Sequence, residues 1–206
     1  MIAAIISSLF LQTASPAVLE NEYVRVTRNS APCASPQTPG CEQRVFVALS
    51  DVDFTLHWEF SDKGKSVPGD VRHFKRGDVV VVGPRDAYEP PERGEYLEVT
   101  IKPTRPPVKS PLVMIPPDKN TIKFDRDAFF VFEEKLEAGE TRARHSHRER
   151  VVIVINKTRL QQWPDGAPEL FRDQIPDDVR FNPPVVHVVK TVGDLPLRNI
   201  VIEFKK

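Results

Sequence analysis

Residues 139–147 read GETRARHSH, a turn glycine followed by an approach into a strand. Side chains alternate between the two faces of a strand, so His145 and His147 are expected on one face, about 7 Å apart along the chain. Two imidazoles on one face can bind one divalent ion, provided that a third ligand arrives from another strand. The spacing therefore predicts part of a metal site.

The third ligand that we expect is His187, in the run VVHVV at residues 185–189. The surrounding valines indicate a buried strand, and a lone histidine in such a strand needs a polar partner. A site of three histidines, with water in the open positions, is chemically reasonable for a divalent transition metal. A weakened or lost site, with no metal, stays open as the alternative.

These residues resemble the two motifs of the cupin superfamily. Gly139, His145 and His147 reproduce the opening of its first motif, G-x5-H-x-H, and the stretch from His187 to Glu203 is similar to the end of a cupin barrel, with a G-D-x-P-x-R turn before the last strand. The resemblance covers about residues 21–205. It implies a jelly-roll β-barrel in which the two motifs face each other across the interior.

In metal-binding cupins the ligands are two histidines and a glutamate from the first motif and a histidine from the second. His145, His147 and His187 match three of these, whereas Val151 and Val152 stand where the glutamate is expected. Thr191 replaces an asparagine of the second motif, and Pro184 replaces its glycine. Glu149 shares a strand face with His147 and is a candidate extra ligand, although its spacing is short.

The sequence also indicates a duplicated β unit, in which apolar, β-branched runs recur in both halves. Arg44 to Val47 align with Arg150 to Ile153, and Tyr88 aligns with His187. We therefore expect an all-β protein of two tandem cupin-type jelly-roll barrels, a bicupin. The expected division is a leader at 1–17, a degenerate barrel at 18–103 and a barrel with the histidines at 104–206, joined by a proline-rich connector.

The first half lacks the site, because the same alignment puts Pro39, Cys41 and Tyr88 where the second half has His145, His147 and His187. The remaining histidines of the first half, His57 and His73, lie among charged residues. We interpret both as surface or structural histidines.

Composition narrows the class of protein further. The chain has 206 residues, with 29 basic and 29 acidic side chains, and this zero net charge argues against a nucleic-acid partner. Its 20 prolines against 9 glycines argue against long helices and favour strands separated by turns.

Residues 1–17 read MIAAIISSLFLQTASPA and resemble a secretory signal peptide, although a basic residue is missing before the apolar stretch. A buried N-terminal strand or helix is the alternative. For an exported chain, Cys33 and Cys41 at the ends of a turn-rich loop predict a disulfide, and two unlinked thiols are the alternative. We expect a secreted or periplasmic protein, free of the membrane after cleavage, or a cytoplasmic one if the leader stays.

Arg142, Arg144, Arg148 and Arg150 flank the histidines but alternate away from them, which favours a solvated strand face over an anion site. Two functions remain: a metal-dependent enzyme acting on a small polar molecule, or a non-catalytic bicupin that binds a ligand or is structural. The cupin fold does not choose between them. The expected partners are a small-molecule ligand and, in addition, a second copy of the chain.

Overall fold

The computed structural model describes residues 16–30, 43–57, 69–84, 86–111 and 114–205. Within these ranges the chain forms seventeen β-strands and no helix, as expected for an all-β protein. Accordingly, no helix in the described part is long and apolar enough to cross a membrane. Residues 1–15 of the predicted leader, Cys33, Pro39 and Cys41 lie outside the described residues, whereas Ala17, the last residue of that leader, is the first residue of strand β1.

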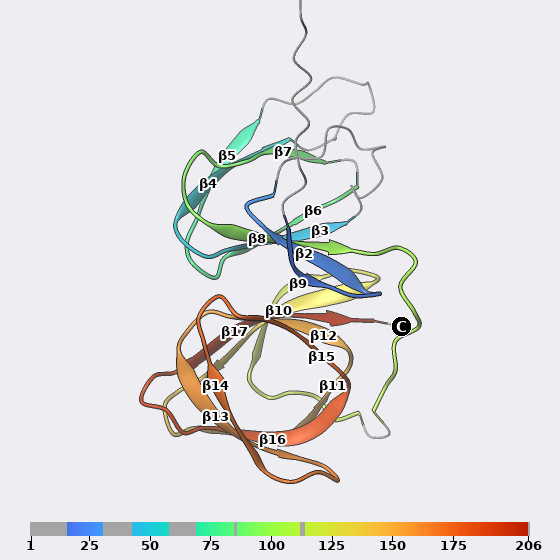
Figure 1. The fold of residues 1–206 in the computed structure, drawn as a ribbon, viewed down its shortest axis with the longest axis vertical. Coiled ribbons are helices and arrows are strands. Elements are labelled where there is room, and N and C mark those ends of the chain that lie inside the picture. The colour runs from blue at the N-terminus through green and yellow to red at the C-terminus, as the bar shows by residue number, and fades with distance from the viewer. Residues whose placement is uncertain (1–15, 31–42, 58–68, 85, 112–113, 206) are drawn as a thin grey trace, which may run out of the picture.

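The strands form two larger and two smaller sheets, which Figure 1 shows as two barrels. One five-stranded sheet has the order β1-β2-β8-β3-β6, formed by Ala17–Glu20, Val24–Arg28, Tyr96–Ile101, Arg44–Ala48 and Val79–Val82. A three-stranded sheet, β5-β4-β7, faces it and consists of Asp70–Phe74, Val52–His57 and Ala87–Glu89. All pairings within these sheets are antiparallel.

The second barrel repeats this arrangement. Its five-stranded sheet has the order β15-β12-β17-β10-β9, formed by Val179–Asn182, Arg150–Val154, Leu197–Phe204, Phe129–Leu136 and Asn120–Asp125. The four-stranded sheet β11-β16-β13-β14 closes it with Thr141–His147, Val185–Thr191, Thr158–Pro164 and Leu170–Gln174. Read in the opposite direction, as β9-β10-β17-β12-β15, its strands follow one another in the same relative chain order as β1-β2-β8-β3-β6 of the first barrel. The duplication therefore extends to the topology. The exact barrel boundary at residue 103 stays a prediction.

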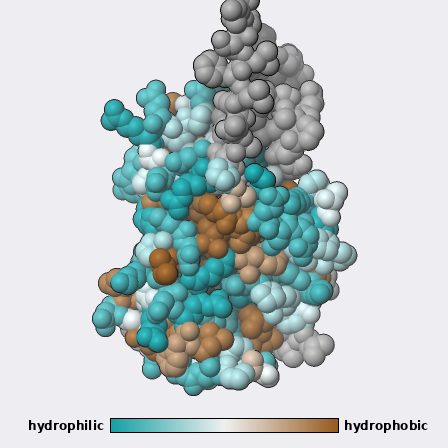
Figure 2. Space-filling model, viewed as in Figure 1, coloured by the Kyte–Doolittle hydropathy of each residue, from teal (hydrophilic) through white to brown (hydrophobic). Residues whose placement is uncertain are grey.

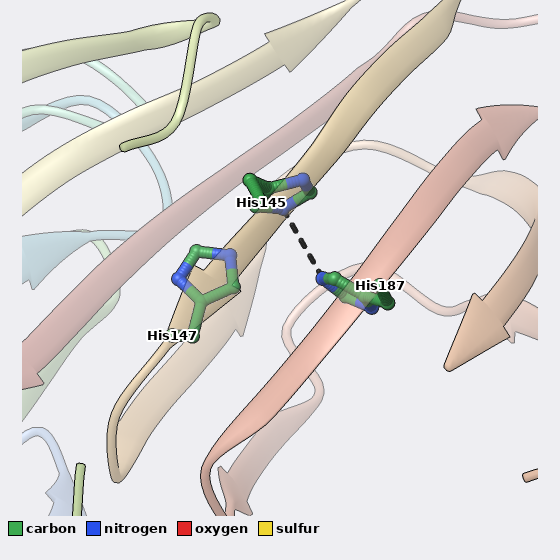
Figure 3. Close-up of side chains that lie close together, drawn as sticks. All are labelled: His145, His147 and His187. Carbon is green, nitrogen blue, oxygen red and sulfur yellow. Dashed lines mark hydrogen bonds between the residues drawn. The ribbon is translucent and has the colours of Figure 1, made fainter. Parts of the chain in front are cut away.

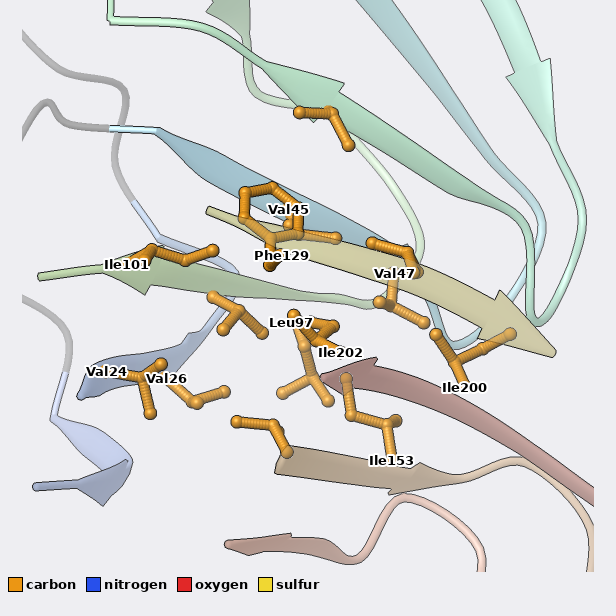
Figure 4. Close-up of a cluster of buried hydrophobic side chains, with 14 of the residues drawn as sticks. Val24, Val26, Val45, Val47, Leu97, Ile101, Phe129, Ile153, Ile200 and Ile202 are labelled. Carbon is orange, nitrogen blue, oxygen red and sulfur yellow. The ribbon is translucent and has the colours of Figure 1, made fainter. Parts of the chain in front are cut away.

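The largest apolar cluster lies between the barrels, where the two five-stranded sheets pack against each other (Figure 4). Val45, Val47 and Leu97 of one sheet meet Phe129, Ile200 and Ile202 of the other, and all six are buried. A separate aromatic cluster around Phe46 and Phe54 fills the first barrel. Because the larger sheets are covered on both faces, their strands read as continuous apolar runs in the sequence, which is why the runs were recognisable.

Polar contacts also join the barrels. The Arg76 guanidinium donates to the carbonyl of Ile155 and pairs with Asp177, at 2.5 Å between Nη2 and Oδ1. In return, Arg198 donates to the carbonyl of Arg76 at 2.9 Å. On the face shown in Figure 2, apolar residues gather near the middle, over the region between the barrels, and hydrophilic residues cover much of the remainder. The two barrels thus form one packed unit.

Candidate metal centre

The three predicted histidines converge in the second barrel (Figure 3). Strand β11 pairs with β16 in a register that places His145 opposite His187 and His147 opposite Val185. Gly139, with φ of +78°, makes the turn into β11, a conformation that glycine adopts without strain. One ligand nitrogen of each histidine lies within 4.8 Å of those of the other two, and all three side chains are buried.

Hydrogen bonds orient two of the three rings. The Nδ1–H of His145 donates to the carbonyl of Ala143 at 2.7 Å, and the Nδ1–H of His147 donates to Oε2 of Glu203 at 2.7 Å. Because Nδ1 carries the proton in both rings, each Nε2 presents a lone pair. A carboxylate or carbonyl behind the imidazole is the usual outer-shell partner of a metal-binding histidine.

His187 completes the cluster from the neighbouring strand. Its Nε2 lies 3.1 Å from Nε2 of His145, close enough for a hydrogen bond, and among the described residues its buried Nδ1 has no partner. A cation held by all three Nε2 atoms would replace the bond between the two rings. Metal–nitrogen bonds of about 2.1 Å at tetrahedral angles would place the nitrogens roughly 3.4 Å apart, so the pair at 3.1 Å would separate slightly and spacings of up to 4.8 Å would close.

All three imidazoles are held in the neutral form that metals bind. Burial lowers the pKa of His145 to about 4, with the Arg142 charge as the next cause. Burial and then the His145 charge lower the pKa of His187 to about 2. The pKa of His147 is also well below its usual range, chiefly because the ring is buried. The site therefore needs no deprotonation of its histidines at neutral pH.

Sequence reasoning missed Glu203, the carboxylate behind His147. Burial raises its pKa to about 7, against the opposing effect of the Arg150 charge. The signal available in the sequence was a single acidic residue in an apolar closing strand, IVIEF at residues 200–204. Such a residue needs a buried polar partner, but only the fold identifies that partner.

Glu149, the candidate extra ligand, is not part of the cluster. Its buried carboxylate accepts hydrogen bonds from the backbone amide of Lys109, at 3.1 and 3.0 Å to its two oxygens. Of the two residues at the family's glutamate position, Val152 lines the interior cavity and Val151 packs in the cluster between the barrels. The histidines therefore stand without a carboxylate ligand from this segment.

A cavity of about 250 Å³ lies beside the histidines, between the two sheets of the second barrel. His147 and His187 form part of its wall. Apolar side chains from several strands form another part, among them Val152, Leu160, Leu170, Val189 and Val201. The volume suits a small molecule.

The arginines beside the histidines are not a uniformly solvated face, and that expectation was wrong for two of them. Arg142 is buried and paired with Glu134, and Arg150 is buried and lines the cavity. Only Arg144 fits the expectation clearly, because it is exposed and paired with Asp165. The bulge in the β11–β16 register between Arg142 and His145 breaks the simple alternation at Arg142, and Arg150 belongs to the next strand, β12, so the alternation along β11 does not apply to it.

The first barrel carries a different interior at the corresponding position. Tyr88, which aligns with His187, is buried and donates to Glu98 at 3.0 Å, and Ser30 donates to the same carboxylate at 2.5 Å. His57 pairs with Glu89 and His73 with Asp53, both partly exposed, as interpreted from the sequence. The cysteine and proline aligned with His147 and His145 lie outside the described residues.

No protein-family model matches the sequence, and no curated protein matches it at a significant level. Solved structures do match the fold. A cupin 2 conserved barrel domain protein from Leptotrichia buccalis aligns over 97% of this chain and 92% of its own, with TM-score 0.54 and 10% identity.

Two oxalate decarboxylases align as well. The enzyme from Lactobacillus farciminis, in a formate complex, covers 89% of this chain and 77% of its own, with TM-score 0.58 and 10% identity. A variant of the Bacillus subtilis enzyme covers 88% and 68%, with TM-score 0.56 and 12% identity. At this identity the likeness establishes the fold, two barrels of the cupin type in tandem, and leaves the activity to be argued from the site.

Proposed function

We propose that this chain, which folds as two tandem cupin barrels, binds one divalent transition metal in its second barrel and uses it on a small polar ligand. The metal would be held by Nε2 of His145, His147 and His187. The observation that carries the proposal is the orientation of the first two rings, whose Nδ1 atoms donate to Ala143 and Glu203 and so leave the Nε2 lone pairs on the side of the cluster.

A divalent ion bound there would polarise a ligand oxygen or activate water or dioxygen. The residues of the chain position the metal ligands and shape the cavity for the small molecule. Glu203 holds the His147 ring in position, and the valine and leucine side chains of the cavity exclude bulk water from one side of the ligand. Three protein ligands leave coordination positions for the ligand.

A metal-free ligand-binding barrel is the second candidate function. It is favoured by the 3.1 Å contact between the Nε2 atoms of His145 and His187, because this hydrogen bond lets the pair remain buried without a cation. The two candidates differ in metal content and share the same cavity.

Metal content of untagged protein separates the candidates. We expect one ion per chain in the wild type after reconstitution with Mn²⁺, Fe²⁺, Co²⁺ or Zn²⁺, and loss of that ion in His147→Ala. His73→Ala is the matched control, because its ring pairs with Asp53 on the first barrel, away from the cluster. An empty wild-type protein after reconstitution would favour the metal-free barrel.

We further propose that the protein is exported and that Cys33 and Cys41 form a disulfide. The support is the sequence alone: the apolar segment before Ser15-Pro16-Ala17 and the two cysteines that enclose a short loop. N-terminal sequencing of protein from an exporting host tests cleavage, and an intact Met1 would count against it. Two reactive thiols in the denatured product would refute the disulfide.

A further inference from the structure

Three arginines from three strands line the cavity beside the histidines: Arg150 on β12, Arg172 on β14 and Arg180 on β15. On β14 the residues that line the cavity are Leu170, Arg172 and Gln174, every second position, so this face of the strand points inward. The cavity wall therefore carries positively charged side chains in addition to its apolar ones.

Two of these charges have partners within the chain. Arg180 pairs with Asp178 at 2.6 Å and also donates to the carbonyl of Asp173. Arg150 donates to the carbonyls of Arg148 and Pro183. The negative charges of Glu203 and Glu134 stabilise the charged form of its guanidinium.

Arg172 differs from both, because within the described part of the chain it makes no hydrogen bond and no ion pair. It is nevertheless only partly exposed. A guanidinium carries a permanent charge and five N–H donors, and its partial removal from water without partners is costly. Burial and the like charge of Arg180 both lower its pKa, so its surroundings within the chain disfavour the charge.

The acidic residue of the cavity wall, Glu134, does not pair with Arg172. Glu134 lines the cavity, but its carboxylate is bound by Arg142 and by the Asn199 amide at 3.1 Å. Arg172 on β14 and His187 on β16 line the same cavity from one sheet, with β13 between their strands. A negatively charged group between them would be stabilised by the Arg172 charge and, with a cation held by the histidines, by that cation as well.

The geometry points to a small organic carboxylate as the ligand of this cavity, with Arg172 as the residue that binds its anionic group. This inference rests on the proposed function in that it names the ligand class of the same site. Three neutral imidazoles leave the charge of a divalent ion uncompensated, and Val152 stands where a protein carboxylate is expected, so an anionic ligand supplies the missing charge.

A carboxylate fits the cavity better than an inorganic anion. A planar guanidinium binds a carboxylate through two parallel hydrogen bonds. Leu160, Leu170 and Val189 give the same cavity an apolar wall that accommodates carbon atoms. The volume of about 250 Å³ limits the ligand to a small acid.

Calorimetric titration with malonate and with its neutral isostere malonamide tests the inference on the wild type, with and without bound metal. We expect malonate to bind at least tenfold more tightly than malonamide and more tightly than inorganic phosphate. Arg172→Gln should weaken malonate at least tenfold. Arg159→Gln, an exposed arginine on the adjacent strand β13 that faces Asp173, should change it less than twofold.

Equal binding of malonate and malonamide by the wild type would overturn the inference, and this comparison needs no variant. The same loss of malonate affinity in Arg172→Gln and Arg159→Gln would overturn it as well. So would tighter binding of phosphate than of malonate to the wild type. Thermal unfolding confirms that Arg172→Gln is folded. If the wild type lacks metal and still binds malonate through Arg172, the metal proposal fails while the carboxylate site stands. If the protein binds metal but does not prefer malonate to malonamide, the carboxylate site fails while the metal proposal stands.

Discussion

The Nδ1 atom of His147 lies 2.7 Å from Oε2 of Glu203, a residue 56 positions further along the chain. Both side chains are almost fully buried, on strands of different sheets. The contact fixes the tautomer of His147 and aims its Nε2 at the two other histidines. It is therefore the relationship on which the affinity of the candidate metal centre should depend most directly after the ligands themselves.

Glu203→Gln should weaken metal binding by about 10- to 100-fold, the usual effect of removing an outer-shell carboxylate. The amide keeps the shape of the side chain, but its neutral oxygen accepts the Nδ1–H hydrogen bond less strongly than a carboxylate does. Competition with a chelator of known affinity measures the change. Glu95→Gln, an exposed carboxylate of the first barrel paired with Arg28, serves as control. Equal affinity in the two variants would contradict the role given to Glu203.

The metal-free protein should lose stability as the pH falls from 7 to 5. The pKa values of His145, about 4, and His187, about 2, lie below the usual value, so the unfolded chain takes up protons first as the pH drops through about 6.5. Glu203, with a pKa raised to about 7, acts in the opposite direction, because its contribution is lost as the pH rises. Because two histidines act against one carboxyl group, the net result is a loss of stability as the pH falls.

Thermal unfolding in the presence of a chelator, from pH 8 to pH 5, measures this dependence. Replacing both His145 and His187 by Gln should flatten the curve over that range. A midpoint that rises as the pH falls, or a double variant with the slope of the wild type, would contradict the burial of neutral histidines as its cause.

The apolar cluster between the barrels should hold the whole chain together. Ile202→Ala, at a fully buried position of this cluster, should lower the free energy of unfolding by about 2–5 kcal/mol. Ile122→Ala, on the edge strand β9 and 56% exposed, should change it by no more than about 0.5 kcal/mol. Urea unfolding followed by circular dichroism gives both values, and similar losses at the two positions would argue against the shared core.

Removing the polar link between the barrels should cost less than removing the apolar one. Arg76→Ala breaks hydrogen bonds to Ile155 and the ion pair with Asp177, and it leaves carbonyls without a donor. A loss of about 1–3 kcal/mol is expected. Arg72→Ala, on the exposed strand β5, is the matched control. An unchanged unfolding midpoint in Arg76→Ala would show that apolar packing alone joins the barrels.

Several strands of the fold were predictable because they are apolar on both faces. β8 was expected at residues 96–101 and β6 at 78–82, and the structure has them at Tyr96–Ile101 and Val79–Val82. Strands with one solvent face were missed, among them β5 and β14, whose sequences DVRHF and LFRDQ mix charged and apolar residues. β4 alternates Val52, Phe54 and Leu56 toward the core, a usable signal that a search for continuous apolar runs does not detect.

The sequence by itself determined the all-β class, the duplication and the two histidines at 145 and 147, because strand alternation and local spacing are properties of neighbouring residues. His187 was recognisable from its motif. Only the tertiary structure decided that Glu203 supports His147, that Glu149 is bound by Lys109 and that Arg172 faces the cavity. These relationships depend on the pairing of strands far apart in the chain and on the closure of two sheets around one cavity, which no local pattern encodes.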